Sequence, residues 1–113
     1  MTTDCLFCRI VRREIPAAIV AEDEHTLAFR DIGPQAPTHV LVIPKVHVAS
    51  LNEVSEGAVL AQVMEMATRV AKDAGVREAG YRVVVNTNAD GGQTVFHLHA
   101  HVLGGRQMHW PPG

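Results

Sequence analysis

Apolar positions in the N-terminal third of the chain predict a short helix followed by a pair of strands. Within residues 5–13 they recur at helical intervals, and they stop before Pro16, a residue that helix interiors exclude. Residues 18–21 and 26–29 are two short apolar runs separated by an acidic cluster. Such a cluster is typical of a turn, so we expect the two runs to pair as antiparallel strands.

Three further runs predict the rest of a sheet. Residues 39–43 are mostly β-branched or apolar, as in a central strand. Residues 81–85 and 94–103 predict a fourth and a fifth strand, joined by the polar loop 86–93. The tail, residues 104–113, is rich in glycine and proline, and we expect it to be irregular.

A broad apolar stripe over residues 56–74 predicts one long helix. Ser55 is its expected N-cap, and Gly75 is its expected residue in the left-handed conformation at the C-terminal end. A stripe this wide can pack one side on the sheet and offer the other to a second subunit. The pattern therefore favours a homodimer.

Composition and charge restrict the class of protein. A chain of 113 residues that is 47% hydrophobic has the size of one domain, residues 1–113. The formal net charge of −2 gives no basic excess for holding a nucleic acid or an anionic membrane. Because the sequence contains neither a long apolar run nor a signal-peptide pattern, we expect a cytoplasmic protein.

Three histidines alternate along the last predicted strand. His97, His99 and His101 should therefore emerge on one face, about 7 Å apart along the chain, and line one groove. An imidazole near neutral pH can act as nucleophile, proton donor or metal ligand, depending on what each ring nitrogen contacts. This row is the strongest chemical signal in the sequence.

The preceding loop offers uncharged donors that suit a phosphate. They are the backbone of Gly92, the carboxamide of Gln93, the hydroxyl of Thr94 and the amide of Asn86. Donors placed around a nucleophile are what phosphoryl chemistry requires, because that chemistry depends mostly on positioning and charge stabilisation. We therefore expect the histidine row to act on a phosphate group.

The segment His97-Leu98-His99-Ala100-His101-Val102-Leu103 resembles the histidine triad motif. Residues 31–44, Asn86, loop 91–94 and the tail 104–113 resemble the nucleotide-binding branch of that family. The resemblance implies an α+β subunit with a short and a long helix and a five-stranded antiparallel sheet. It also implies a homodimer that pairs through the long helix and joins its two sheets, with the tail completing the site near the interface.

The same resemblance implies hydrolysis of purine nucleoside 5′-phosphoramidates, with release of AMP or GMP and no catalytic cofactor. His99, the middle histidine, would be the nucleophile and form a nucleotidyl-histidine. His101 would hydrogen-bond the phosphate, and Asn86 and Thr94 would donate to its oxygens. The carbonyl of His97 would fix the tautomer of His99.

The nucleotide half of the substrate is also assigned by resemblance. His39 matches a further histidine of the catalytic network, and Asp31 would accept hydrogen bonds from the ribose. Trp110 would approach the site of the neighbouring subunit. The apolar slot for the base would be formed by Phe7, Phe29 and Ile32.

Cys5 and Cys8 have the spacing of half a tetrahedral zinc site, which two histidines could complete. In related proteins with this cysteine pair, the other ligands match His47 and His97. We expect a structural zinc that locks the first helix to the sheet, and in that case His97 cannot be the general acid. The alternative is a pair of buried thiols.

Three other functions remain open at this point. His97 and His99 could share a catalytic metal with His101 or His39 and activate water directly. The chain could instead be a nucleotide-binding scaffold with vestigial activity. It could also cleave dinucleoside polyphosphates, as another branch of the same family does.

Overall fold

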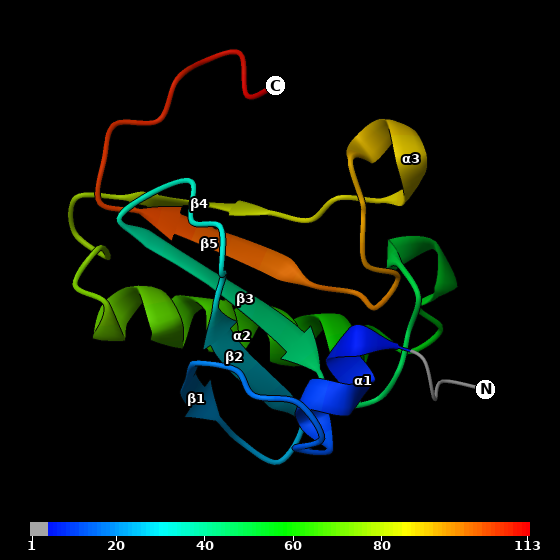
Figure 1. The fold of residues 1–113 in the computed structure, drawn as a ribbon. Helices are drawn as coiled ribbons and strands as arrows, with labels where there is room; N and C mark the ends of the chain where they lie inside the picture. The colour runs from blue at the N-terminus through cyan, green and yellow to red at the C-terminus, as the bar shows by residue number, and fades with distance from the viewer. Residues whose placement is uncertain (1–4) are drawn as a thin grey trace.

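The computed structural model describes residues 5–113, and the strands in this part of the chain form one antiparallel sheet (Figure 1). The order of its five strands is β1-β2-β3-β5-β4. This leaves β3 at the centre and β4 and β1 at the two edges. The strands are β1 (Ile19–Glu22), β2 (Thr26–Arg30), β3 (Thr38–Pro44), β4 (Tyr81–Val84) and β5 (Ala100–Gly104).

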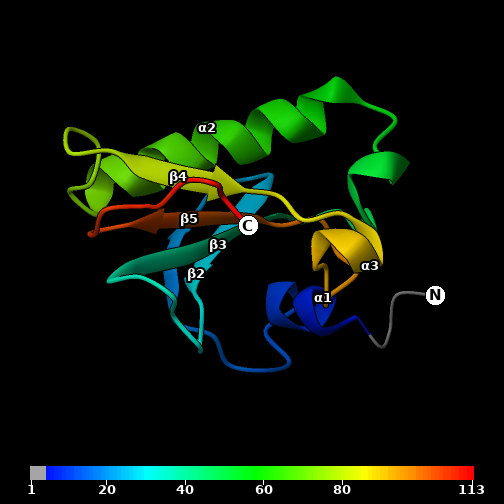
Figure 2. The same ribbon diagram turned by 90° about the horizontal axis from the view of Figure 1, so that it is seen from above.

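Helices cover both faces of the sheet, as the view from above shows (Figure 2). The long helix α2 (Gly57–Asp73) lies along one face, and the short helix α1 (Leu6–Val11) lies on the other. Two single-turn elements, η1 (Leu51–Glu53) and α3 (Asn88–Gly91), lie in the connections. The predicted α+β architecture is thus confirmed. Within residues 5–113, no helix is long and apolar enough to cross a membrane.

The central strand β3 separates two apolar clusters. Val40 and Val42 face α2, whereas Leu41 and Ile43 face α1. This alternation follows from the two-residue period of a strand, and it explains why the run is apolar on both sides. The cluster under α1 forms the floor on which the histidines lie; its members are Phe7, Ile10, Leu27, Phe29, Leu41 and Ile43.

The last strand is shorter than predicted, and this is the main correction to the fold. It begins at Ala100, not at residue 94, because its pairing with β3 starts at Val42. The preceding segment leaves the sheet, and the N–H of Leu98 donates to the carbonyl of Val48 at 2.7 Å. His97 and His99 therefore precede the strand, and only His101 lies within it.

Two local predictions also change. Ser55 does not cap α2: the N-cap is Glu56, which makes no side-chain capping hydrogen bond within the described residues. The loop predicted at 86–93 contains the helical turn α3. The predicted end of α2 is confirmed, because Gly75 has a φ of 78°, in the left-handed region that favours glycine.

Gly104→Ala should destabilise the fold by about 1–3 kcal/mol, because a methyl group has no room there. A Cβ at Gly104 would lie 2.9 Å from both Cβ and Cγ1 of Val76. Urea denaturation of the single variant measures the cost. In a Val76→Ala background, which removes the two γ-methyl groups, part of that cost should disappear; an equal cost in both backgrounds would contradict this explanation.

Candidate active site

A groove of about 390 Å³ opens on the α1 side of the sheet. Its apolar lining comes from α1 and the chain that follows it, together with Phe29. Its polar lining includes Asp31, Thr94, His99 and His101. A mostly apolar groove with a few polar groups is the usual form of a small-molecule site.

The groove collects many of the residues that the sequence predicts for a nucleotide site. Besides the four polar residues, these are Phe7, Phe29 and Ile32. Ile32 lies at the rim and is fully exposed. The grouping accords with the predicted site, whereas the role of each residue remains a prediction.

The three triad histidines do not share the groove equally. His99 and His101 line it, and their ring centroids lie 5.0 Å apart. His97 has no exposed surface and lies beneath α1, where the ring of Phe7 packs edge-on against it at 5.9 Å. The groove therefore offers a pair of imidazoles, and the third histidine serves another purpose.

His99 has the geometry of a nucleophile. Its Nδ1 lies 2.8 Å from the carbonyl oxygen of His97. A carbonyl can only accept, so Nδ1 carries the proton and Nε2 keeps its lone pair. Phe7 packs edge-on against the ring at 5.2 Å and helps to hold its orientation. The predicted contact with the His97 carbonyl is thus present in the structure.

A hydrogen-bond chain determines the tautomer of His101. The backbone N–H of Gln35 donates to His39 Nδ1 at 3.0 Å, so His39 carries its proton on Nε2. His39 Nε2 in turn donates to His101 Nδ1 at 2.9 Å. His101 must therefore carry its own proton on Nε2. In residues 5–113, this is the one buried side-chain nitrogen or oxygen without a partner.

His39 and His101 are both neutral at physiological pH. Burial, together with the neighbouring His99 and His39, lowers the pKa of His101 to about 4, against the opposing effect of Asp31. Burial also lowers the pKa of His39, although Asp31 Oδ2 lies 3.5 Å from its Nε2. The Nε2–H of His101 is thus a neutral, buried donor without a partner, on a ring that lines the groove.

Acidification should weaken the fold through His101. The pKa of His101 is about 4 in the folded chain and about 6.5 in the unfolded chain. At a pH between these two values, the unfolded chain binds a proton on this imidazole and the folded chain mostly does not. Stability is therefore complete above about pH 6.5 and is lost as the pH falls toward 4. Between about pH 7 and about pH 5, wild type should lose roughly 1–2 kcal/mol more than His101→Gln, measured by urea denaturation.

Wild type and His101→Gln both contain His97. Its pKa is also lowered to about 4, chiefly by burial, and its contribution cancels in the difference. Equal losses of stability in wild type and His101→Gln would show that His101 binds its proton equally well in both states.

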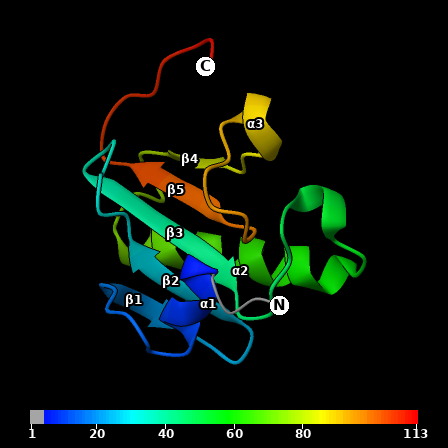
Figure 3. The same cartoon turned by 45° about the vertical axis from the view of Figure 1, so that its right-hand side comes forward.

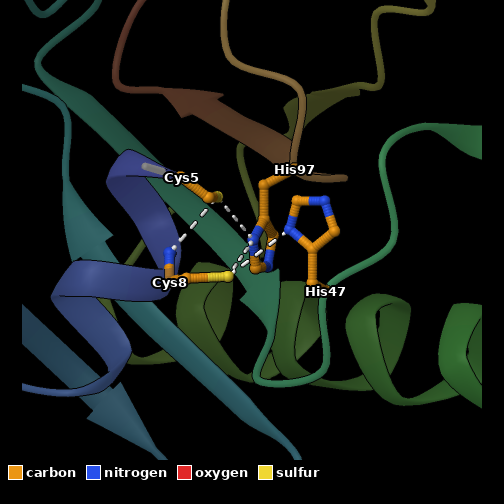
Figure 4. Close-up of side chains that lie close together, drawn as sticks. All are labelled: Cys5, Cys8, His47 and His97. Atoms are coloured by element: carbon orange, nitrogen blue, oxygen red, sulfur yellow. Dashed lines mark hydrogen bonds between the residues drawn. The ribbon is translucent and has the colours of Figure 1, made fainter. Parts of the chain in front are cut away.

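His97 belongs to a second cluster, shown in Figure 4, with Cys5, Cys8 and His47. The four ligand atoms all lie within 4.8 Å of one another. His97 Nδ1 is 3.3 Å from the sulfur of Cys5, and His47 Nδ1 is 3.4 Å from that of Cys8. Tetrahedral zinc would hold sulfur and nitrogen ligands about 3.6 Å apart, so the donor set and its spacing fit that ion.

The tautomer of His97 suits metal binding as well. Its Nε2 donates to the carbonyl of Pro44 at 2.8 Å, which leaves the Nδ1 lone pair facing the two sulfur atoms. This orientation turns the ring away from the groove. It argues against a catalytic metal shared between His97 and His99.

The structure also brings together a second group of potential metal ligands, which hydrogen bonding explains better than a metal does. Asp31, His39 and His101 have ligand atoms within 4.8 Å of one another. A metal on His39 Nε2 would displace its proton, while Nδ1 already accepts from the Gln35 N–H. The ring would then have to be an imidazolate anion. A hydrogen-bond chain explains the same contacts with neutral groups.

The loop before the motif is held internally. The carboxamide of Gln93 is buried; it donates to the carbonyls of Ala49 and Val95 and accepts from the N–H of Asn88. Its amide therefore fixes the loop instead of facing the groove, contrary to the expectation that it serves as a phosphate donor. Gly92 ends α3 in the left-handed conformation with a φ of 85°.

Two predicted site residues lie apart from the groove lining. Asn86 is half-buried in the connection between β4 and α3. Trp110 is 82% exposed on the C-terminal tail, which extends away from the sheet beyond β4 (Figure 3). Sequence reasoning missed Gln35, because its contribution to the site is a backbone N–H that any residue except proline supplies.

Comparisons with known proteins cover nearly the whole chain. A model of the HIT domain matches residues 12–108. The purine nucleoside phosphoramidase of Escherichia coli K12 is 46% identical over 110 residues, which cover 96% of this chain and 92% of that protein. The 14 kDa zinc-binding protein of Zea mays is 51% identical over 112 residues, covering 96% and 87%. A HIT family hydrolase from Legionella pneumophila superposes with a TM-score of 0.95 and 54% identity, covering 97% of this chain and 100% of that one.

Proposed function

This chain belongs to the histidine triad (HIT) domain family and is a hydrolase of that family; from this premise we propose that it hydrolyses purine nucleoside 5′-phosphoramidates to AMP or GMP and an amine. One observation carries the proposal. The lone pair of His99 Nε2 and the unpartnered N–H of His101 belong to adjacent rings on one groove. This pairs a nucleophile with a donor for the charge that develops during attack.

The reaction would proceed in two steps. His99 Nε2 attacks the phosphorus, a P–N(His) bond forms, and the P–N bond to the amine breaks. His101 donates its Nε2–H to a phosphoryl oxygen and stabilises the added charge. Since His101 and His39 are neutral and each holds a single ring proton, we assign the proton on the departing amine to solvent. Water then cleaves the nucleotidyl-histidine and restores His99.

The remaining groove residues would bind the nucleotide. The apolar side chains of the lining, Phe7 and Phe29, would hold the purine, and Asp31 would accept from the ribose. Asp31 Oδ1 already accepts from the N–H of Gly33 at 2.8 Å, which keeps the carboxylate in place. Thr94 would donate to the phosphate, and so would Asn86, from the connection between β4 and α3, outside the groove lining.

The zinc site would be structural. Cys5, Cys8, His47 and His97 fit a tetrahedral ion, and the Zea mays relative is named a zinc-binding protein. When bound, zinc would cross-link α1 to the segment that follows β3 and to the segment that precedes β5. The thiolate ligands suit a reducing, cytoplasmic location.

A homodimer would join two copies through α2 and β4. Among the strands described, β4 is at the edge of the sheet, so its outer backbone groups can pair with a second copy. The tail beyond β4 carries the exposed Trp110 toward the region where such a partner would lie. Sedimentation of the purified chain tests the proposed stoichiometry.

A substrate panel tests the proposed function against the two remaining alternatives. Adenosine and guanosine 5′-phosphoramidates with a fluorescent amine should turn over, and AMP should compete with them. Turnover of a diadenosine polyphosphate alone would assign the chain to the other branch of the family. AMP binding with no turnover of any substrate would make it a scaffold.

A further inference from the structure

The position of the ring proton on His101, whose side chain lines the groove, depends on one backbone N–H. If His39 carried its proton on Nδ1, this donor would face the N–H of Gln35, and the two would repel each other. His39 Nε2 would then accept, and His101 would turn its proton toward it on Nδ1. His101 Nε2 would become an acceptor, the wrong polarity for an anionic phosphoryl group.

Gln35 lies at the exposed part of the 31–37 loop, between β2 and β3. The contacts within this loop are local: the N–H of Gly33 donates to Asp31, and the Gln35 side-chain amide donates to the Gly33 carbonyl at 2.9 Å. Such contacts shape the turn, and Ala36, next to Gln35, is buried. A further contact acts on the Gln35 backbone itself.

Arg106, which follows β5, reaches across to this loop. Its Nε and Nη2 both donate to the Gln35 carbonyl, at 3.1 and 3.0 Å, and its Nη1 donates to the carbonyl of Gln107 at 3.2 Å. Two donors on one oxygen restrict both its distance and its direction.

The residue before Arg106 packs against the same loop. Gly105 has a φ of 91°, and a Cβ there would lie 2.9 Å from Cβ of Pro37. Only glycine fits such an approach in this conformation. The start of the tail therefore contacts the loop at two places, Gln35 and Pro37.

We propose that Arg106 is a positioning residue for the hydrolysis: by holding the Gln35 carbonyl, it keeps the Gln35 N–H on His39 and thereby keeps the proton of His101 on Nε2. Arg106 touches neither the reacting atoms nor the groove lining, and it acts entirely through the hydrogen-bond chain. The kinetic part of this inference rests on the proposed function, whereas the tautomers can be measured without substrate.

The test combines kinetics with nitrogen spectroscopy of the full-length, zinc-loaded chain. Long-range ¹H–¹⁵N correlation of the imidazoles identifies the protonated nitrogen of each ring. Wild type should show single Nε2–H forms for His39 and His101, and Arg106→Ala should add the Nδ1–H form of His39. In that variant kcat should fall about tenfold, with KM changed less than about twofold.

Two further variants separate positioning from general loosening of the tail. Arg106→Lys retains a cationic donor for the carbonyl and should restore part of both effects. Arg82→Ala removes a different hydrogen bond to the tail, from Arg82 Nη2 to the His109 carbonyl at 2.9 Å, and should leave the tautomers as in wild type. Arg106 is exposed, so its replacement should not unfold the chain.

Three results would overturn the proposal. The first is wild-type tautomers in Arg106→Ala. The second is the same mixture of tautomers in Arg82→Ala as in Arg106→Ala. The third is a changed tautomer in Arg106→Ala without a fall in kcat. If wild type cleaves no phosphoramidate, the proposed function fails. The tautomer measurement then still decides whether Arg106 controls the hydrogen-bond chain.

Discussion

His99→Ala should abolish phosphoramidate turnover, lowering kcat by a factor of at least about a thousand. The variant loses the proposed nucleophile, the Nε2 lone pair of His99, which is available because the His97 carbonyl holds the ring proton on Nδ1. The adjacent N–H of His101 would remain and could still stabilise charge, but no covalent intermediate could form. Steady-state kinetics with a fluorogenic adenosine phosphoramidate measures the loss.

Acid quenching followed by mass spectrometry completes this test. Wild type should carry one nucleotidyl group during turnover, and His99→Ala should carry none. His25, whose side chain is 53% exposed in the turn between β1 and β2, provides the matched control: His25→Ala should behave as wild type. Turnover that survives the loss of His99 would assign the nucleophile elsewhere.

Removing zinc should lower the melting temperature by roughly 10 °C or more, because an ion bound only by the folded chain stabilises it by several kcal/mol. The proposed ligands lie far apart in the sequence, at α1, after β3 and before β5. A tetrahedral ion would join these three segments at once. Thermal denaturation of zinc-loaded protein, with and without a strong chelator, measures the difference.

Cys8→Ala is the matched variant for zinc. It should lower the melting temperature to near that of the chelated wild type and should no longer respond to the chelator. A wild-type melting temperature that ignores the chelator would mean that Cys5 and Cys8 are simply buried thiols. At 20 °C, where the chelated protein should remain folded, turnover should persist; reversible loss of turnover with the metal would favour the metallohydrolase mechanism.

The sequence predicts the sheet best where side chains alternate between two cores. Residues 39–43 are recognisable because both faces of β3 are buried. The same alternation continues through residues 94–99, but those residues do not extend the sheet. Pairing with β3 begins only at Ala100, and the segment before it bends to place His97 under α1. Periodicity cannot distinguish a strand from an extended segment whose partner strand has ended.

In the candidate site, the sequence predicts contributions from side chains but not those from the backbone. The histidines, the cysteine pair and Asp31 are visible in the sequence because each is a chemically distinct side chain. The contact of Gln35 with His39 is not visible, since a backbone N–H leaves no compositional trace. Gln93 shows the opposite error: its carboxamide looks like a ligand donor, but the structure uses it to hold a loop.

Two of the contacts that set the ring protons, the His97 carbonyl and the Gln35 N–H, belong to the main chain. No substitution at position 97 removes that carbonyl, and at position 35 only proline removes the N–H. The side chains at these positions can therefore vary during evolution without directly changing which ring nitrogens carry protons. At position 97 the side chain is constrained by the proposed metal site. We therefore expect that a homologue without the two cysteines can also replace this histidine and still keep the ring proton of its middle histidine on Nδ1.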